Sequence, residues 1–229
     1  MRSFACGLAA LTVLPCLGAV SMAGVVVSLD GTYGPIGAHG GASADTPDPN
    51  NDNVTGESPN TFVSEEIEIT ALDPIDLVLG VTNSGGITEY FLDIGTVRNS
   101  TGVDWYGFRA TGGSGYGDDF VPGRDMPPGV FASNPRWDYD ITPSTDVFDL
   151  TRTEEDTVEF YGGGVLHHGE TGLGLNFAGD IPDIIIPGVS GYQLTIRLEP
   201  LGTVPEPTTL TLLSVAALAI GWQVHRRKR

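Results

Sequence analysis

Cysteine is scarce in this sequence. The only two cysteines, Cys6 and Cys16, lie within the first 23 residues, which carry the pattern of a secretory signal peptide. A mature chain without these residues has no internal disulfide, no cysteine–zinc site and no cysteine nucleophile. An exported domain of this kind must be stabilised by burial alone or with bound ions.

The pattern at the N-terminus has three parts. Met1-Arg2 is a minimal positive start, residues 4–17 form an apolar stretch too short to span a membrane comfortably, and Ser21-Met22-Ala23 places small residues at a cleavage site. We therefore predict that residues 1–23 are a signal peptide and that the mature chain begins at Gly24.

Positive charge is also scarce. The chain has 29 acidic and 11 basic side chains, and Lys228 is its single lysine. Leaving out Arg2, Glu206 and the four basic residues after 225 leaves 28 acidic residues and 6 arginines, a net charge of −22 for residues 24–203. Such a domain repels nucleic acid and attracts divalent cations, so we expect no nucleic-acid partner. Adaptation to a saline habitat explains the same acidity equally well.

A helical apolar repeat is missing from residues 24–200. Short runs rich in Val, Ile, Thr and aromatic residues recur there instead, separated by Gly, Pro, Asn and Asp. Glu66-Ile67-Glu68-Ile69 and residues 193–198 alternate polar with apolar side chains, which gives one wet and one buried face. We predict an all-β fold, a single antiparallel, jelly-roll-like β-sandwich over residues 24–203.

The strands are expected at ten places. The predicted ranges are 25–29, 62–70, 75–81, 88–97, 104–110, 147–150, 157–161, 172–177, 181–186 and 192–198. The glycine-rich stretches 112–119 and 162–164 open no helix and contain no lysine, so we predict loops there and no phosphate site.

One turn and the strand after it are rich in aromatic residues. Asn99 and Gly102 suit positive φ in a hairpin loop, and Trp105 with one of Tyr106 and Phe108 is predicted to fill the core. The functional alternative is that Trp105 or Tyr106 stacks on sugar rings.

An acidic loop is the best candidate for a binding site. This acidic loop, residues 45–57, is rich in Asp and Asn. Ca²⁺ is bound by six to eight oxygen ligands, and side chains of these types can supply them from one flexible loop. The candidate ligands are Asp45, Asp48, Asn50, Asp52 and Glu57. It is not an EF-hand, because Asn53 replaces the turn glycine and Pro59 the last glutamate. The alternative is a solvated loop without a bound ion.

Catalytic signatures are few. His167-His168 is the only histidine pair, and adjacent residues of a regular strand face opposite sides, so the pair is not expected to chelate one metal. No nucleophile elbow is present. We predict that the protein is not an enzyme; a surface hydrolase would require His167 or His168 in a cleft beside a carboxylate.

The C-terminus combines a short rigid motif, an apolar run and a basic end. Val204-Pro205-Glu206-Pro207 precedes 17 uncharged residues, 208–224, and the stub 225–229 follows, with Arg226, Arg227, Lys228 and Arg229. A helix of that length reaches roughly 25 Å, close to a hydrocarbon core of about 30 Å. We predict one C-terminal transmembrane helix with its basic end in the cytoplasm. An ordinary single-span anchor would look similar.

Residues 204–229 resemble the PEP-CTERM sorting signal, in which the three parts stand in this order. The resemblance implies a Gram-negative host, exosortase as partner, anchoring in the membrane before processing, and then delivery to the cell surface or to matrix polysaccharide. Our leading interpretation is an exported non-catalytic surface or extracellular-matrix protein. The alternative is a Ca²⁺-dependent carbohydrate-binding module on the cell surface.

Overall fold

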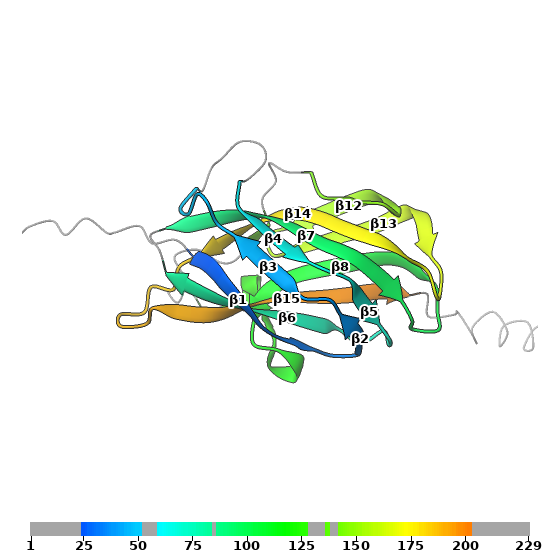
Figure 1. The fold of residues 1–229 in the computed structure, drawn as a ribbon, viewed down its shortest axis with the longest axis horizontal. Coiled ribbons are helices and arrows are strands. Elements are labelled where there is room, and N and C mark those ends of the chain that lie inside the picture. Colours follow the sequence, from blue (N-terminus) through cyan, green and yellow to red (C-terminus); the bar gives the residue numbers. More distant parts are fainter. Residues whose placement is uncertain (1–23, 52–58, 84–85, 128–135, 138–141, 203–229) are drawn as a thin grey trace, which may run out of the picture.

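The computed structural model describes residues 24–51, 59–83, 86–127, 136–137 and 142–202, with the backbone alone at 136–137. These residues form strands in two sheets, with two short 3-10 helices, η1 (Gly117–Asp119) and η2 (Gly123–Asp125), which confirms the all-β prediction (Figure 1). The described residues contain no helix with the length and apolar character needed to cross a membrane. The predicted span 208–224 lies outside them.

The first sheet contains most of the long strands. Its order is β1 (Gly24–Tyr33), β6 (Ile75–Asn83), β15 (Gly191–Gly202), β8 (Trp105–Ser114), β13 (Thr157–Leu166) and β12 (Phe148–Glu154), and β9 (Val121–Pro122) also pairs with β8.

The second sheet is built around the pair β14–β7. Its order is β10 (Arg136–Trp137), β14 (Thr171–Pro182), β7 (Ile87–Asn99), β4 (Thr61–Ser64) and β3 (Ala42–Asp45). In addition, β11 (Ser144–Thr145) pairs with β14, and β5 (Ile67–Ile69) pairs with both β2 (Ile36–His39) and β7.

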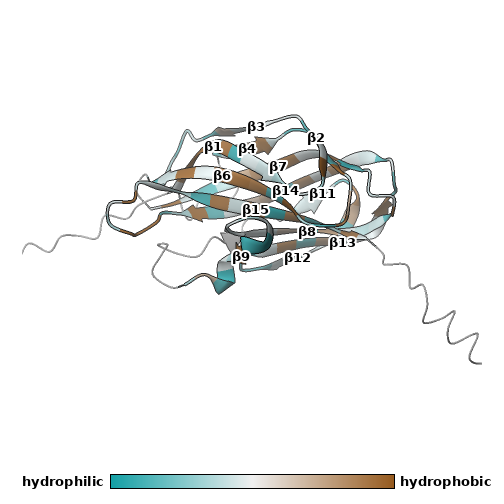
Figure 2. Cartoon of the chain, turned by 90° about the horizontal axis from the view of Figure 1, so that it is seen from below, coloured by the Kyte–Doolittle hydropathy of each residue, from teal (hydrophilic) through white to brown (hydrophobic). Residues whose placement is uncertain are grey.

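One hydrophobic core lies between the two sheets. Alternate side chains of the long strands are buried in it, and apolar stretches alternate with polar ones along the ribbons in Figure 2. Phe160 of β13 and Phe177 of β14 meet across the sheets with ring centroids 6.3 Å apart. The predicted alternation therefore places apolar side chains inward from both layers, as in a sandwich.

The predicted strand 62–70 is wrong in two respects. It is divided into β4 and β5, and both pair with β7 in the parallel sense, so the antiparallel, jelly-roll-like arrangement holds only in part. The break falls at Glu65 and Glu66, which continue the backbone pairing to Gly41 and Gly40. A Cβ on Gly95 of β7 would lie 2.5 Å from the Ser64 carbonyl oxygen, so the absence of a side chain there permits the close approach.

Two further boundaries differ from the prediction. Two separate strands were expected at 172–177 and 181–186, but one continuous strand, β14, runs through 172–177 and ends at Pro182. Ile185 and Ile186 lie after it and are exposed. Gly112, Gly113 and Ser114 belong to β8, and glycines 162–164 belong to β13, so the loops predicted there are wrong at those residues.

The described chain begins and ends at opposite ends of the sandwich. Gly24 pairs with Asn83 and lies against Ile181, whereas Gly202 pairs with Trp105. The acidic loop connects β3 to β4 at the end near Gly24, because Asp45 pairs with Thr61 there.

Candidate functional site

The two ends of the acidic loop are held together by Asn60. This fully buried side chain accepts a hydrogen bond from the Asp48 amide (2.9 Å) and donates to the Asp48 carbonyl oxygen (2.8 Å). It also donates to the carbonyl oxygen of Glu89 at the start of β7 (3.0 Å). The loop therefore enters and leaves the sandwich at one fixed point, which the sequence did not indicate because a single asparagine before a strand is common.

The next residues of the loop are fixed through the same strand. The Asn51 side-chain oxygen accepts hydrogen bonds from the Glu89 amide (2.9 Å) and from Asn60 (3.0 Å). The Asn50 amide donates to Thr88 (3.2 Å), and the φ of Asn50 is 62°, in the left-handed region that asparagine tolerates. Loop residues 48–51 are thus positioned by hydrogen bonds to Asn60, Thr88 and Glu89, partly through their backbone and partly through the Asn51 side chain.

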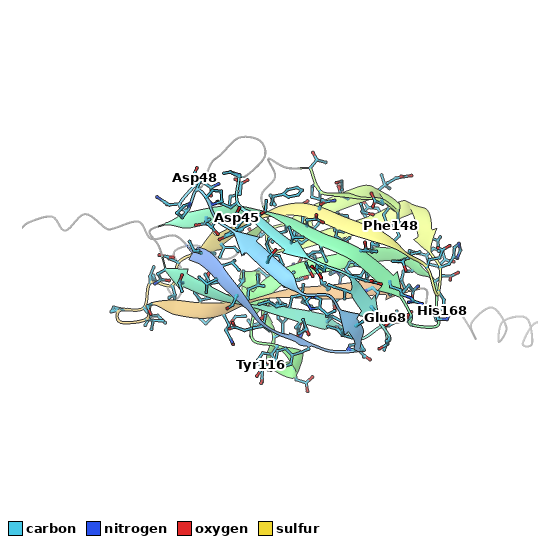
Figure 3. All side chains as sticks on the ribbon, in the orientation of Figure 1. Asp45, Asp48, Glu68, Tyr116, Phe148 and His168 are labelled. Atoms are coloured by element: carbon cyan, nitrogen blue, oxygen red, sulfur yellow. The ribbon has the colours of Figure 1, made fainter. Side chains whose placement is uncertain are left out.

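The structure brings part of the predicted calcium site together. Asp45 and Asp48 lie at one end of the sandwich (Figure 3), and Asn50 follows on the same stretch. Asp52 and Glu57 lie outside the described residues. Within the part of the chain that the structure describes, no group of three or more His, Cys, Asp or Glu is arranged to hold a metal ion. The Ca²⁺ site stays a prediction.

Buried carboxylates next to this loop were missed by sequence reasoning. Glu89 and Asp180 are directly opposite each other on β7 and β14, both are buried, and Asp183 is buried beyond the end of β14. All three have interactions with other groups. Burial, and then the charge of Asp183, raise the pKa of Tyr192 well above its usual range. No pattern distinguishes these acids from the many exposed ones.

The histidine pair lies at the opposite end of the molecule, in the turn after β13. His167 Nδ1 is 3.1 Å from Asp104 Oδ2, and the His168 amide donates to Asp104 Oδ1 (3.1 Å). The pair is not on a regular strand, so the prediction from opposite strand faces does not apply. The backbone hydrogen bond from His168, followed by the bond to His167, lowers the pKa of Asp104, while the Asp104 bond raises the pKa of His167.

This arrangement meets one of the two conditions set for a hydrolase. A histidine does lie beside a carboxylate, but the side chains of His167 and Asp104 are 59% and 38% exposed. Neither residue lines the two cavities described below. His168 Nδ1 accepts a hydrogen bond from the Gly102 amide (3.0 Å), so the pair fastens one turn to another.

The aromatic strand is placed largely as predicted. Trp105 and Phe108 are fully buried, and Tyr106 is exposed. Gly102 has φ 83°, but Asn99 does not have positive φ and that prediction is wrong. Asn99 is instead buried and donates to the carbonyl oxygens of Val103 (2.8 Å) and Leu166 (2.9 Å), closing the turn from within. A buried Trp105 offers no ring to a sugar.

Residues 116–126, which include η1, β9 and η2, fold over the outer face of the first sheet and are called the outer-face segment below. Arg197 of β15 makes two hydrogen bonds to Asp76 of β6, of 2.7 and 2.8 Å, and a third to the Gly117 carbonyl oxygen (2.7 Å). Asp76 in turn accepts from the Gly117 amide (2.7 Å), and Phe120 packs under the Arg197 guanidinium at 4.0 Å. The nearly buried ion pair between Arg197 and Asp76 therefore holds the segment against the first sheet.

Three of the six arginines of residues 24–203 surround a hollow of about 230 Å³ on that face. Arg109 pairs with Glu159 (2.6 Å) and Glu199 (3.4 Å). Arg124 pairs with Glu154, and Arg197 with Asp76. Since these side chains are matched by carboxylates, their grouping does not create a basic patch.

A larger cavity of about 500 Å³ lies between the same segment and the beginning of β15, at Tyr192 and Gln193. Val121, Met126, Pro127 and Ile184 give it apolar walls, and Asp119 and Gln193 bring polar groups to it. No motif in the sequence joined these residues, because they come from three separate segments.

Comparisons with known proteins address the C-terminus alone. No curated protein and no solved structure matches the chain. The family model of the PEP-CTERM protein-sorting motif matches residues 203–228. That match includes Pro205, Glu206, Pro207, Arg226, Arg227 and Lys228, and it implies export, processing by exosortase and sorting to the cell envelope. The chain is therefore a protein that carries a PEP-CTERM sorting motif at residues 203–228.

Proposed function

We propose that this chain is an exported, non-catalytic protein of the cell surface or extracellular matrix. Residues 208–224 hold it in the membrane of a Gram-negative bacterium while exosortase processes the Pro205-Glu206-Pro207 motif. The β-sandwich of residues 24–202 is the part delivered. The sorting-motif match at residues 203–228 is the observation that carries this proposal.

The described domain supports a binding or structural role over a catalytic one. Among its described aromatic side chains, Trp105 and Tyr90 are fully buried in the core, where they stabilise the sandwich. Its one histidine–carboxylate pair is exposed and joins two turns. These features are those of a stable module displayed outside the cell.

The basic end of the tail provides the test. Replacing Arg226, Arg227, Lys228 and Arg229 with glutamate removes the charges that hold the tail on the cytoplasmic side. We expect loss of membrane retention and of processing. Intact mass of the protein recovered from native cells measures processing, since it fixes both termini, and the share of the protein in the membrane fraction measures retention. A matched variant with lysine at all four positions keeps the charge and should be processed normally; normal processing of the glutamate variant contradicts the proposal.

The second candidate is a Ca²⁺-dependent carbohydrate-binding module. It is favoured by the fixed ends of the acidic loop, where Asn60 and Asn51 hold residues 48–51 against β7. A loop whose ends are already ordered loses less conformational entropy when it closes around an ion.

A further inference from the structure

The 500 Å³ cavity has the size and composition of a small-ligand site. Pockets for small ligands have about 300–1,000 Å³ and combine apolar walls with a few placed polar groups. Here Val121, Met126 and Ile184 contribute apolar surface, while Gln193 and Asp119 contribute an amide and a carboxylate. The cavity lies outside the acidic loop and away from the histidine pair.

One wall of the cavity, at Gly115, is held in place by hydrogen bonds to the first sheet. Thr195 donates a hydrogen bond to the carbonyl oxygen of Gly115 (2.6 Å), one of the lining residues. Two residues later, both backbone groups of Gly117 are held by Asp76 and Arg197. A preordered site loses little entropy on binding, so modest contacts give useful affinity.

Two tyrosine rings stack on each other near the segments that form the cavity, although neither ring is among its lining residues. Tyr116 directly follows the lining residue Gly115, and it projects from the outer-face segment in Figure 3. Its ring stacks on that of Tyr33 from β1, with centroids 4.0 Å apart and planes inclined by 8°. The two residues remain 43% and 41% exposed. Each ring covers one face of the other, so only an outer ring face and the edges, which carry the hydroxyl groups, can contact a ligand.

A row of planar polar groups lies beside the cavity. Asp30 accepts a hydrogen bond from Ser28 (2.6 Å) through one oxygen and from Gln193 (2.9 Å) through the other. Gly80 lies beneath them, where a Cβ would be 2.4 Å from Ser28 Oγ and 2.8 Å from Asp30 Oδ1. The missing side chain at Gly80 thus lets the row lie flat on the sheet.

Together these groups match the two surfaces of a pyranose ring. Its C–H face suits the tyrosine rings and apolar walls, and its hydroxyl groups suit an amide and carboxylates. The described lining residues include no Arg, Lys or His, whereas Asp119 and nearby Asp30 are acidic. In a domain of net charge −22, an anionic sugar would be repelled.

We propose that the cavity between the outer-face segment and β15, with the Tyr33–Tyr116 stack, binds an uncharged sugar unit of a glycan without Ca²⁺. This inference deepens the proposed surface function and rests on it, but the binding can be measured separately from the sorting.

The test uses the full chain in a detergent that has no sugar headgroup. Calorimetry measures binding of three kinds of probe: neutral hexasaccharides of glucose and xylose, hexagalacturonate, and fully deacetylated chitohexaose. We expect at least one neutral probe to bind, equally well with EDTA, and hexagalacturonate not to bind. Tyr116→Ala should weaken binding by about three- to tenfold, the scale of one aromatic contact.

Two variants control for effects on folding. Tyr161→Ala removes a similarly exposed ring from β13 and should leave affinity unchanged. Gln193→Leu keeps the shape but loses the amide, and it should weaken binding without lowering the melting temperature. Equal effects of Tyr116→Ala and Tyr161→Ala, or no binding of any neutral probe, overturn the proposal.

Other outcomes also decide. Preference for the cationic chitohexaose that disappears in salt indicates ion exchange on an acidic surface and overturns the proposal. Loss of binding with EDTA assigns it to the acidic loop instead. If the sugar does not bind but the native protein is still processed and found at the cell surface, only this inference fails.

Discussion

At the scale of single residues, Asp104 joins two turns through its contacts with the histidine pair. One oxygen meets the His167 ring and the other accepts the His168 amide. The pKa of His167 is raised, so protonation stabilises this contact at low pH and the benefit is lost as pH rises through the folded-state pKa. The pKa of Asp104 is lowered, so its contribution is lost only as pH falls through that value. The contact is strongest between the two pKa values.

Asp104→Asn should lower the pKa of His167 toward its ordinary value. The cause is loss of the carboxylate bond and charge, which dominate the upward shift. NMR titration of the histidine rings measures it. His39 is the internal control, because burial lowers its pKa and Asp104 plays no part in that shift. An unchanged His167 pKa would show that the contact does not form in solution.

The burial and contacts of individual residues could be predicted only where hydrophobicity determines them. Trp105 and Phe108 are core residues as expected, because large apolar rings gain most from burial. Asn99 was assigned a backbone role, but its amide hydrogen-bonds carbonyl oxygens of two different segments. A partner 67 residues away is set by tertiary structure, and local sequence contains no sign of it.

At the scale of elements, β13 contains an irregularity that depends on glycine. Its pairing with β8 jumps from Tyr161 opposite Gly107 to Leu166 opposite Trp105. Gly162 and Gly163 have φ of 71° and 72° within this bulge. A Cβ on Gly163 would lie 2.1 Å from Asp149 Oδ2 and 2.8 Å from Asp149 Cβ, so β12 packs directly on the bare backbone.

Gly163→Ala should therefore destabilise the fold more than Gly169→Ala. Both positions have positive φ, which costs an L-residue roughly 1–2 kcal/mol. Only Gly163 also meets a neighbouring strand, whereas a Cβ at Gly169 has nothing within 4 Å. We expect an extra loss of about 1–3 kcal/mol, the scale of overpacking, in urea unfolding. Equal losses would mean that β12 does not pack on the bulge.

The sequence predicted where strands lie better than it predicted where one strand ends and the next begins. Runs rich in β-branched and aromatic residues located the strands near 75–81, 88–97 and 192–198, and alternation marked the last of these. The break within residues 62–70 was missed, although two adjacent glutamates, Glu65 and Glu66, interrupt the alternation at that point. Whether a strand pairs in parallel depends on its neighbours, which periodicity does not report.

At the scale of the whole molecule, the excess negative charge surrounds one uninterrupted core. Apolar side chains from both sheets form a single cluster, with Trp105, Phe108 and Phe160 among its largest members. The net charge of −22 acts on that core as a self-repulsion that counterions relieve. Cations should accordingly affect stability in two ways, by general screening and by any specific site.

Ca²⁺ should raise the melting temperature more than Na⁺ at equal ionic strength. A ligand at 100 times its dissociation constant stabilises by about 2.7 kcal/mol, which corresponds to a rise of roughly 5–11 °C for a domain of this size. Calorimetry of the full chain measures it, and a chelator should reverse it.

Asp48→Asn should reduce the Ca²⁺ effect, whereas Asp118→Asn, which removes an exposed carboxylate from η1, is the matched control. Equal melting curves with Ca²⁺ and Na⁺ would reject the calcium site, and equal effects of the two variants would reduce it to screening.

The candidate sites differ in how far sequence could reach them. The sorting motif is contiguous, so its spacing alone identified it, and the family comparison supports it. The cavity is assembled from residues 114–127, 184 and 192–193, which only folding brings together. Tyr33 and Tyr116, 83 positions apart, stack because a turn of one segment meets the edge strand of a sheet.

The opposite placement of Gly24 and Gly202 has an electrostatic consequence. Strand β15 has 12 residues, which at about 3.3 Å each cover roughly 40 Å. When β15 points away from the bilayer that the proposed span 208–224 crosses, the acidic loop lies about five Debye lengths of roughly 8 Å from the end of β15 that leads to the span. Anionic headgroups then barely repel that end, so a strongly acidic module can remain tethered next to a membrane of like charge.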